Sequence, residues 1–174
     1  IPSGFFDGMP EVTDLSYAFQ GCYNLVTVPN NLLDLNTKLT TIHHLFTSTI
    51  IAQLPDDFLK YNTEITNVSF AFVGALTSLP VDIFKYTTKL TDVSYVFYQQ
   101  IGAVFALDEN MFANCPAITD FRNAFDGCSL MTGSGLNFIA VVSGVGHVIP
   151  TDTADCFNSC DDLSDYASIP AAWK

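Results

Sequence analysis

The sequence predicts an α/β solenoid of about five units of 25–28 residues, with short parallel strands, short helical segments and an irregular C-terminal cap. One observation is a recurring phrase: "LTDVSYVF" at residues 90–97 returns as "VTDLSYAF", "LTTIHHLF", "ITNVSFAF" and "ITDFRNAF". A second is the spacing of Pro2, Pro29, Pro55 and Pro80, which lie 27, 26 and 25 residues apart, with Asp108 a further 28 residues on. We therefore divide the domain into a five-repeat solenoid, 1–128, and an irregular insertion with a capping repeat, 129–174.

Two columns of the repeat are nearly free of variation. Every unit ends on a phenylalanine: Phe19, Phe46, Phe72, Phe97 and Phe125. Every unit also has a threonine six residues before it: Thr13, Thr40, Thr66, Thr91 and Thr119. A unit of this length cannot bury its own apolar side chains, so like residues of neighbouring units must cover one another.

The local patterns predict where strands and helices lie within a unit. Apolar segments that end at the repeat proline, such as 25–28, 51–54, 76–79 and 104–107, are predicted to be the strands. An apolar pair opens a predicted helix at 83–90. A second helix is expected at 92–98, capped by Thr91, since Val93, Val96 and Phe97 have i, i+3, i+4 spacing.

The two ends depart from the repeat. The register fails after Cys128, and the glycines of 129–150 predict an enlarged loop with room for one extra strand. "CFNSC" at 156–160 then resumes the phrase, and Trp173 is expected to cover the last apolar layer. The chain begins in mid-unit at Ile1-Pro2, without a methionine or a signal peptide, so we expect further repeats or another domain upstream.

Composition excludes several classes of function. Hydrophobic residues make up 49% of the chain, which predicts a folded protein, but no apolar run approaches the roughly 18 residues of a membrane span. The net charge of −12 disfavours binding to nucleic acid or to anionic lipid.

The stretch "LTSLPVDIFKYTTKLTDVSYVF" resembles the repeats of the BspA-like leucine-rich-repeat family of bacterial surface proteins. The resemblance covers the five units of 1–128, and in 129–174 only "CFNSCDDLSDY". It implies a leucine-rich-repeat-like solenoid, secreted or on the outer surface of a bacterium, that acts in adhesion or protein binding. The family brings no catalytic residue and no cofactor. Its loop cysteine is kept at Cys22, Cys128 and Cys160, and is replaced by Thr49, Ala75 and Gln100 in the middle units.

Reactive side chains do not converge in the sequence. His43 and His44 are adjacent but have no second ligand at metal-binding spacing. The cluster of Asp161, Asp162 and Asp165 matches no calcium-binding loop. With neither a nucleophile elbow nor a phosphate-binding loop, the sequence predicts no catalytic, cofactor or metal site.

The five cysteines allow two interpretations. Free, buried thiols are the simpler one, because an odd number cannot all pair within the chain. The alternative is a Cys128–Cys160 disulfide, which requires that the two units stack directly.

One further column is a candidate contact surface, and we call it the aromatic column. Its members are Tyr17, His44, Phe70, Tyr95 and Asn123. On a helix these positions would point away from the buried face, where exposed rings could contact a partner protein or a glycan. If neighbouring units cover the rings instead, a structural spacer within a larger surface protein becomes the better hypothesis. Exposure of the column therefore distinguishes the two functions, and an enzyme is a distant third.

Overall fold

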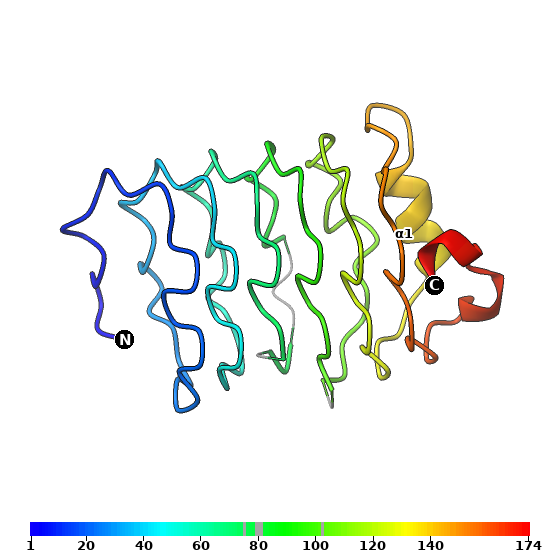
Figure 1. Cartoon of the computed structure of the whole chain (residues 1–174), viewed down its shortest axis with the longest axis horizontal. Coiled ribbons are helices and arrows are strands. Elements are labelled where there is room, and N and C mark those ends of the chain that lie inside the picture. Colours follow the sequence, from blue (N-terminus) through cyan, green and yellow to red (C-terminus); the bar gives the residue numbers. More distant parts are fainter. Residues whose placement is uncertain (75, 79–81, 102) are drawn as a thin grey trace.

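The computed structural model describes residues 1–74, 76–78, 82–101 and 103–174, which wind into successive turns of a solenoid (Figure 1). The turns lie side by side from the N-terminus to the C-terminus, and a helix and two short 3₁₀ helices cover the C-terminal end. The expectations for Ala75, Leu79 and Pro80 lie outside the described residues.

The recurring phrase forms the parallel ladder that joins the turns. Isolated parallel bridges link Asp14, Thr41, Asn67, Asp92, Asp120 and Asp152 in succession. Alternate N–H groups that follow each bridge donate to the next unit: Val93 to Asp120 O (3.0 Å), Tyr95 to Arg122 O (2.9 Å) and Phe97 to Ala124 O (2.9 Å). The prediction of a helix at 92–98 is therefore wrong.

Tight turns take up the remaining N–H groups of the phrase. The N–H of Val96 donates to Val93 O, and that of Tyr98 to Tyr95 O, both at 3.2 Å. Tyr95 and Gln99 have positive φ angles of 55°, as the third residue of a type II turn requires. These turns place Val93, Val96 and Phe97 on one side of the chain, as a helix would. The i, i+3, i+4 spacing therefore does not distinguish a helix from a pair of tight turns. The helix predicted at 83–90 is also wrong, because that segment forms turns such as Thr87 N–H to Phe84 O (3.1 Å).

The continuous ladder of bridges lies in the recurring phrase and not in the segments that were predicted to be strands. Of those segments, 104–107 does carry a parallel bridge, between Ala106 and Thr132. The segments at 25–28 and 51–54 are extended connections, joined to neighbours by bonds such as Ile50 N–H to Leu25 O (3.1 Å). In the fourth unit, Val104 is 71% exposed between the buried Ala103 and Phe105, so this apolar residue of the predicted strand does not face the core.

The phenylalanine column forms the centre of the core. Adjacent rings stack with centroids 5.6–6.3 Å apart, from Phe19 through Phe46, Phe72, Phe97 and Phe125 to Phe157. Trp173 is 7% exposed and lies 6.2 Å from the ring of Phe157, so the prediction that it covers the last layer is confirmed.

Helix α1 (Gly135–Val142) replaces the loop that was predicted after Cys128. Ser134 caps its first turn by accepting from Asn137 N, and the carboxylate of Asp165 accepts from the N–H groups of Gly135 (2.9 Å) and Leu136 (3.1 Å). The 3₁₀ helices η1 (Tyr166–Ser168) and η2 (Ala171–Trp173) complete the cap, on the right in Figure 1. Among the described residues, no helix has the length and hydropathy needed to cross a bilayer.

Candidate functional site

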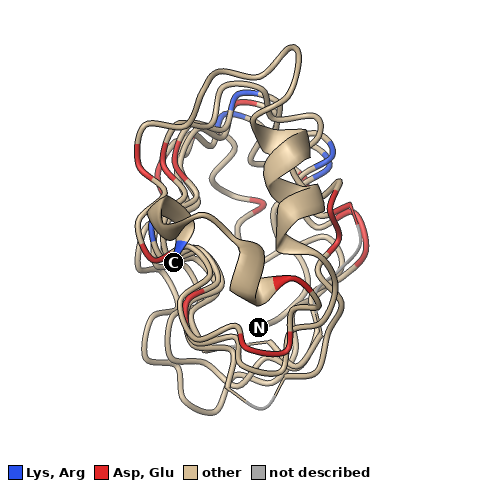
Figure 2. Cartoon of the chain, turned by 90° about the vertical axis from the view of Figure 1, so that its right-hand side faces the viewer, with Lys and Arg blue, Asp and Glu red and all other residues tan. Residues whose placement is uncertain are grey.

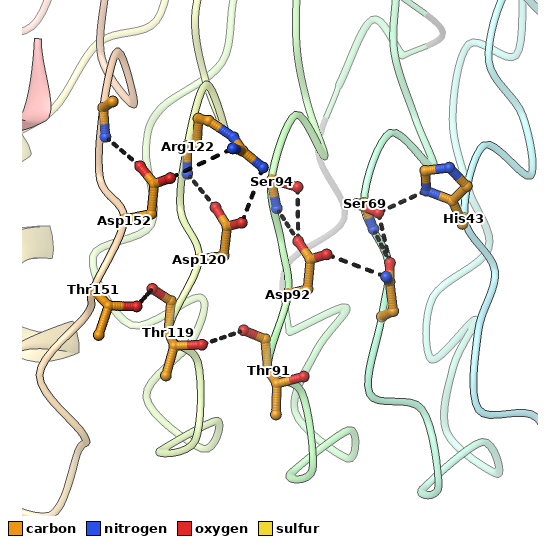
Figure 3. Close-up of polar contacts among 12 residues, drawn as sticks. His43, Ser69, Thr91, Asp92, Ser94, Thr119, Asp120, Arg122, Thr151 and Asp152 are labelled. Atoms are coloured by element: carbon orange, nitrogen blue, oxygen red, sulfur yellow. Dashed lines mark hydrogen bonds and ion pairs between the residues drawn. The ribbon is translucent and has the colours of Figure 1, made fainter.

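The invariant threonines form a hydrogen-bonded ladder along the solenoid. Each hydroxyl donates to the carbonyl of the threonine one unit earlier: Thr40 to Thr13, Thr66 to Thr40, Thr91 to Thr66, Thr119 to Thr91 and Thr151 to Thr119, at 3.0–3.4 Å (Figure 3). The expectation that they cap helices is wrong, since no helix follows them. Thr151 is a sixth member, which the sequence comparison missed because Pro150 replaces the apolar residue that precedes the other threonines.

The next residue of each unit closes an Asx-type turn. Asp92 Oδ1 accepts from the N–H of Ser94 at 2.9 Å and from its hydroxyl at 2.7 Å. The same side-chain oxygen to N–H bond recurs at Asp14, Thr41, Asn67, Asp120 and Asp152. These side chains fix the start of the turns, which explains their shared residue types.

A chain of polar contacts crosses the ladder from His43 to Asp92 (Figure 3). Asn67 Nδ2 donates to Asp92 Oδ2 at 3.1 Å, so Asn67 Oδ1 is left to accept from the Ser69 hydroxyl at 2.6 Å. The Ser69 oxygen must then accept from His43 Nδ1, 2.6 Å away. His43 Nε2 in turn accepts from the Tyr17 hydroxyl at 3.1 Å. In the neutral tautomer that this sequence of bonds favours, the His43 proton lies on Nδ1.

The aromatic column is a continuous stack of rings beside this chain. His44 lies 4.9 Å from Tyr17 and 4.4 Å from Phe70, each at 14°, and Tyr95 lies 4.2 Å from Phe70 at 8°. Tyr17 is 52% exposed, and His44, Phe70 and Tyr95 are half-buried. Burial of all the rings would have excluded this column as a contact surface. Because the rings are partly exposed, the column remains a candidate contact surface.

Backbone conformation makes these rings unusual. Tyr17, His44, Phe70, Tyr95 and Asn123 all have φ between 54° and 63°. Glycine and asparagine accept this left-handed region readily, whereas other residues lose roughly 1–2 kcal/mol there. Asn123, which is buried, meets the conformational requirement of the turn without a ring. The turn itself therefore does not require an aromatic side chain.

His44 presents a hydrogen-bond acceptor in the middle of the stack. The Thr47 hydroxyl donates to Phe70 O at 2.7 Å, so its oxygen accepts from His44 Nδ1 at 2.9 Å, which leaves Nε2 unprotonated in the neutral ring. Burial, and to a lesser degree the neighbouring His43, lower the pKa of His44. The neutral form with a bare Nε2 is thus the form at neutral pH.

The downstream end of the stack is covered by an arginine. The guanidinium carbon of Arg122 lies 6.0 Å from the centre of the Tyr95 ring. Its nitrogens pair with Asp120 (3.2 Å) and Asp152 (3.5 Å), as Figure 3 shows. Burial raises the pKa of Asp120, and its bond from the Arg122 N–H opposes that rise.

The cysteines are free thiols in the structure. Cys128 Sγ donates to Phe97 O at 3.2 Å and Cys160 Sγ to Phe125 O at 3.1 Å, so the Cys128–Cys160 disulfide is not formed. Thr49 and Gln100, in the same column, likewise donate to phenylalanine carbonyls. At these four positions the column supplies a donor to a buried carbonyl, whereas Cys22 is exposed. The mixture of Cys, Thr and Gln indicated this role, but sequence reasoning missed it.

Other candidates do not form a reactive centre. Ser69 is 3% exposed, and its hydroxyl is occupied by His43 and Asn67. In the ranges that the structure describes, no three His, Cys, Asp or Glu side chains are grouped so that they could hold a metal ion. Asp165 lies instead at the start of α1. An open depression of about 480 Å³ is lined mostly by residues without a titratable group, such as Val26, Ala52 and Pro55, and by Asp56.

Comparison with known proteins bears on the fold. No family model and no curated protein matches the sequence. Among solved structures, the chain is similar to the leucine-rich repeat domain of APL1 (TM-score 0.57, 15% identity) and to the LRIM1/APL1C complex (TM-score 0.55, 14% identity). Each similarity covers 76% of this chain, but only 34% and 24% of the respective matched chains. With its stacked turns and parallel ladder, the chain therefore has a leucine-rich-repeat-like solenoid fold.

Proposed function

We propose that this chain is a non-catalytic binding module of a secreted or surface-exposed bacterial protein, and that the aromatic column is its contact surface in adhesion. The observation that carries the proposal is the placement of Tyr17, His44, Phe70 and Tyr95 at left-handed positions that the fold fills with asparagine at Asn123. Three stacked pairs, at about 0.5–1.5 kcal/mol each, do no more than offset the conformational penalty of four such residues. A partner that contacts the rings explains why they are there.

The orientation of the rings favours a protein partner over a glycan. Near-parallel stacking buries the ring faces against one another, so the column presents mainly edges and polar tips to solvent. Sugars stack on ring faces, whereas an irregular protein surface can contact edges, hydroxyls and the bare His44 Nε2. One structural neighbour, the LRIM1/APL1C complex, is itself an assembly of two proteins.

The test is a binding screen of the purified chain against defined extracellular proteins and printed glycans. The key variant replaces Phe70 and Tyr95 with asparagine, which removes two rings and keeps residues suited to positive φ. We expect a protein ligand whose binding is lost in this variant and retained in Tyr61→Ala, which removes an exposed ring elsewhere. A ligand that binds both variants equally would exclude the column as the contact surface.

A structural spacer without its own ligand is the alternative. It is favoured by the uninterrupted bonding from unit to unit, which suits a rigid connecting element. Absence of any ligand in the screen, with the variant fully folded, would support this second function.

A further inference from the structure

The open depression of about 480 Å³ lies along two successive connections of the solenoid. Among the described residues, it is lined by members of 26–30 and by 52–56. Residues 1–3 adjoin the other side of the first connection, where the Ser3 hydroxyl donates to Asn31 Oδ1 at 2.9 Å. The depression therefore lies within the solenoid and not at its first edge.

The two connections begin side by side but are not joined along the depression. The N–H of Ile50 donates to Leu25 O at 3.1 Å, just before the depression begins. From there on, no backbone hydrogen bond links residues 26–30 with residues 52–56, all of which the structure describes. The N–H and C=O groups of residues 26–28 also have no hydrogen-bond partner elsewhere in the described ranges. An open space of ligand size is thus lined by backbone with unpaired donors and acceptors.

Other connections of the same solenoid show what such backbone binds. Further downstream, the segment 104–107 forms a parallel bridge to the next unit, between Ala106 and Thr132. The N–H of Leu107 donates to Thr132 O at 2.8 Å, and the N–H of Thr132 donates to Phe105 O at 3.0 Å. In that pair of connections, each extended segment is the hydrogen-bond partner of the other. The backbone at 26–28 has no such partner among the described residues.

We infer that the depression is a docking site for an extended peptide segment of a partner protein, which pairs as a short β-strand with the backbone of residues 26–28 and 52–54. In recognition of this kind, main-chain hydrogen bonds supply affinity and pockets for alternate side chains supply specificity. Val28 and Leu54 are the buried members of the lining, so they offer an apolar floor to such side chains. A volume of about 480 Å³ also lies within the roughly 300–1,000 Å³ that is usual for ligand sites.

The charge of the lining limits which peptides fit. Asp56 is the charged side chain of the described lining, and it forms no ion pair within the described part of the chain. The net charge of the chain is −12. An acidic peptide is therefore repelled, and the peptide that fits has β-branched or small apolar side chains together with a lysine or an arginine. The connections are separate from the ladder that bears the aromatic column, so this inference goes beyond the proposed function.

The experiment is a selection of short random peptides, displayed on phage, against the purified chain, with the variant Ala52→Phe as the counter-selection. Ala52 is exposed, so a phenylalanine there fills the depression and leaves the core intact. We expect peptides with alternating apolar side chains and a basic residue, whose affinity for Ala52→Phe, measured by calorimetry, is at least about tenfold weaker. Val104→Phe is the matched control, because Val104 is 71% exposed on a connection that is already bridged, and it should leave the affinity unchanged.

Chemical synthesis then tests the backbone pairing. Methylation of alternate amide nitrogens of a selected peptide removes hydrogen-bond donors and keeps every side chain, so it should weaken binding at least about tenfold. Full binding of the methylated peptide would overturn the inference. It would also be overturned if no selected peptide distinguished the native chain from Ala52→Phe, or if Ala52→Phe abolished self-association of the chain, which would assign the depression to a second copy.

The two proposals fail separately. Replacement of Phe70 and Tyr95 with asparagine should not change the affinity for a selected peptide. A chain that binds a protein through these rings but selects no peptide loses only this inference. A chain that binds a peptide in the depression but no ligand through its rings loses only the proposed function.

Discussion

Replacing Phe97 with alanine removes a middle ring of the buried phenylalanine column. Phe97 has no exposed surface, and its ring lies 5.7 Å from Phe125, 5.8 Å from Phe72 and 6.1 Å from Phe84. Truncation of a buried phenylalanine typically costs about 3–5 kcal/mol, and three aromatic neighbours place this site near the upper end, at about 4–5 kcal/mol. That is a large part of the roughly 5–15 kcal/mol that stabilises a whole domain.

The assay is urea unfolding followed by far-UV circular dichroism and by fluorescence of Trp173, the single tryptophan. Because each unit contacts only its neighbours, the cavity should also uncouple the two halves of the solenoid. We therefore expect the two signals to coincide in the native sequence and to separate in Phe97→Ala, since Trp173 reports only on the C-terminal end. A loss below about 1.5 kcal/mol, the lower range for core truncations, would refute the role assigned to this column. Tyr61→Ala, an exposed control, should change stability by less than about 0.5 kcal/mol.

Three further outcomes are expected. Ellman's reagent should modify one thiol of the native protein, the exposed Cys22, and all five thiols in denaturant. Burial protects the other thiols and raises, for example, the pKa of Cys128 to about 12. A count of three thiols in denaturant would instead reveal a disulfide. The folded-state pKa of His44 lies below the ordinary histidine pKa of about 6.5, so the unfolded chain binds the proton first. Stability should therefore fall as pH drops through about 6.5 toward that lower pKa, and His44→Asn should flatten this part of the pH profile of thermal unfolding. Lys89→Met breaks an exposed ion pair with Glu64 and should lower the free energy of unfolding, measured by urea titration, by no more than about 0.5 kcal/mol. A larger loss would show that this surface pair contributes substantially to stability.

Repetition was the part of the structure that the sequence predicted well. The phenylalanine column, the order of the units and the covering role of Trp173 all follow from the requirement that like residues bury one another. The nature of the ladder could not be read in the same way. Val93, Val96 and Phe97 have helical spacing, but a pair of tight turns buries the same three side chains.

Residues with a left-handed backbone conformation are the feature that distinguishes tight turns from a helix in the recurring phrase. Gly21, Gly74 and Gly127 share a column with Gln99, and that recurrence of glycine indicates positive φ. Tyr95 gives no such indication, because a tyrosine does not reveal a left-handed conformation. Helix α1 was missed for a different reason: Asp165, some 30 residues away, bonds to the first N–H groups of the helix, and no local pattern shows that contact.

The direction of the hydrogen bonds between units has a mechanical consequence. They run along the long axis of the solenoid, and the two ends of the chain lie at opposite ends of that axis (Figure 1), while Figure 2 looks along it. A pull on the termini therefore loads the junctions in tension, one row of bonds at a time, rather than shearing all of them together. Each unit of about 26 residues that comes loose lengthens the chain by about 90 Å at roughly 3.3–3.6 Å per residue. A protein built in this way yields stepwise under load, and single-molecule stretching should record a series of similar extensions.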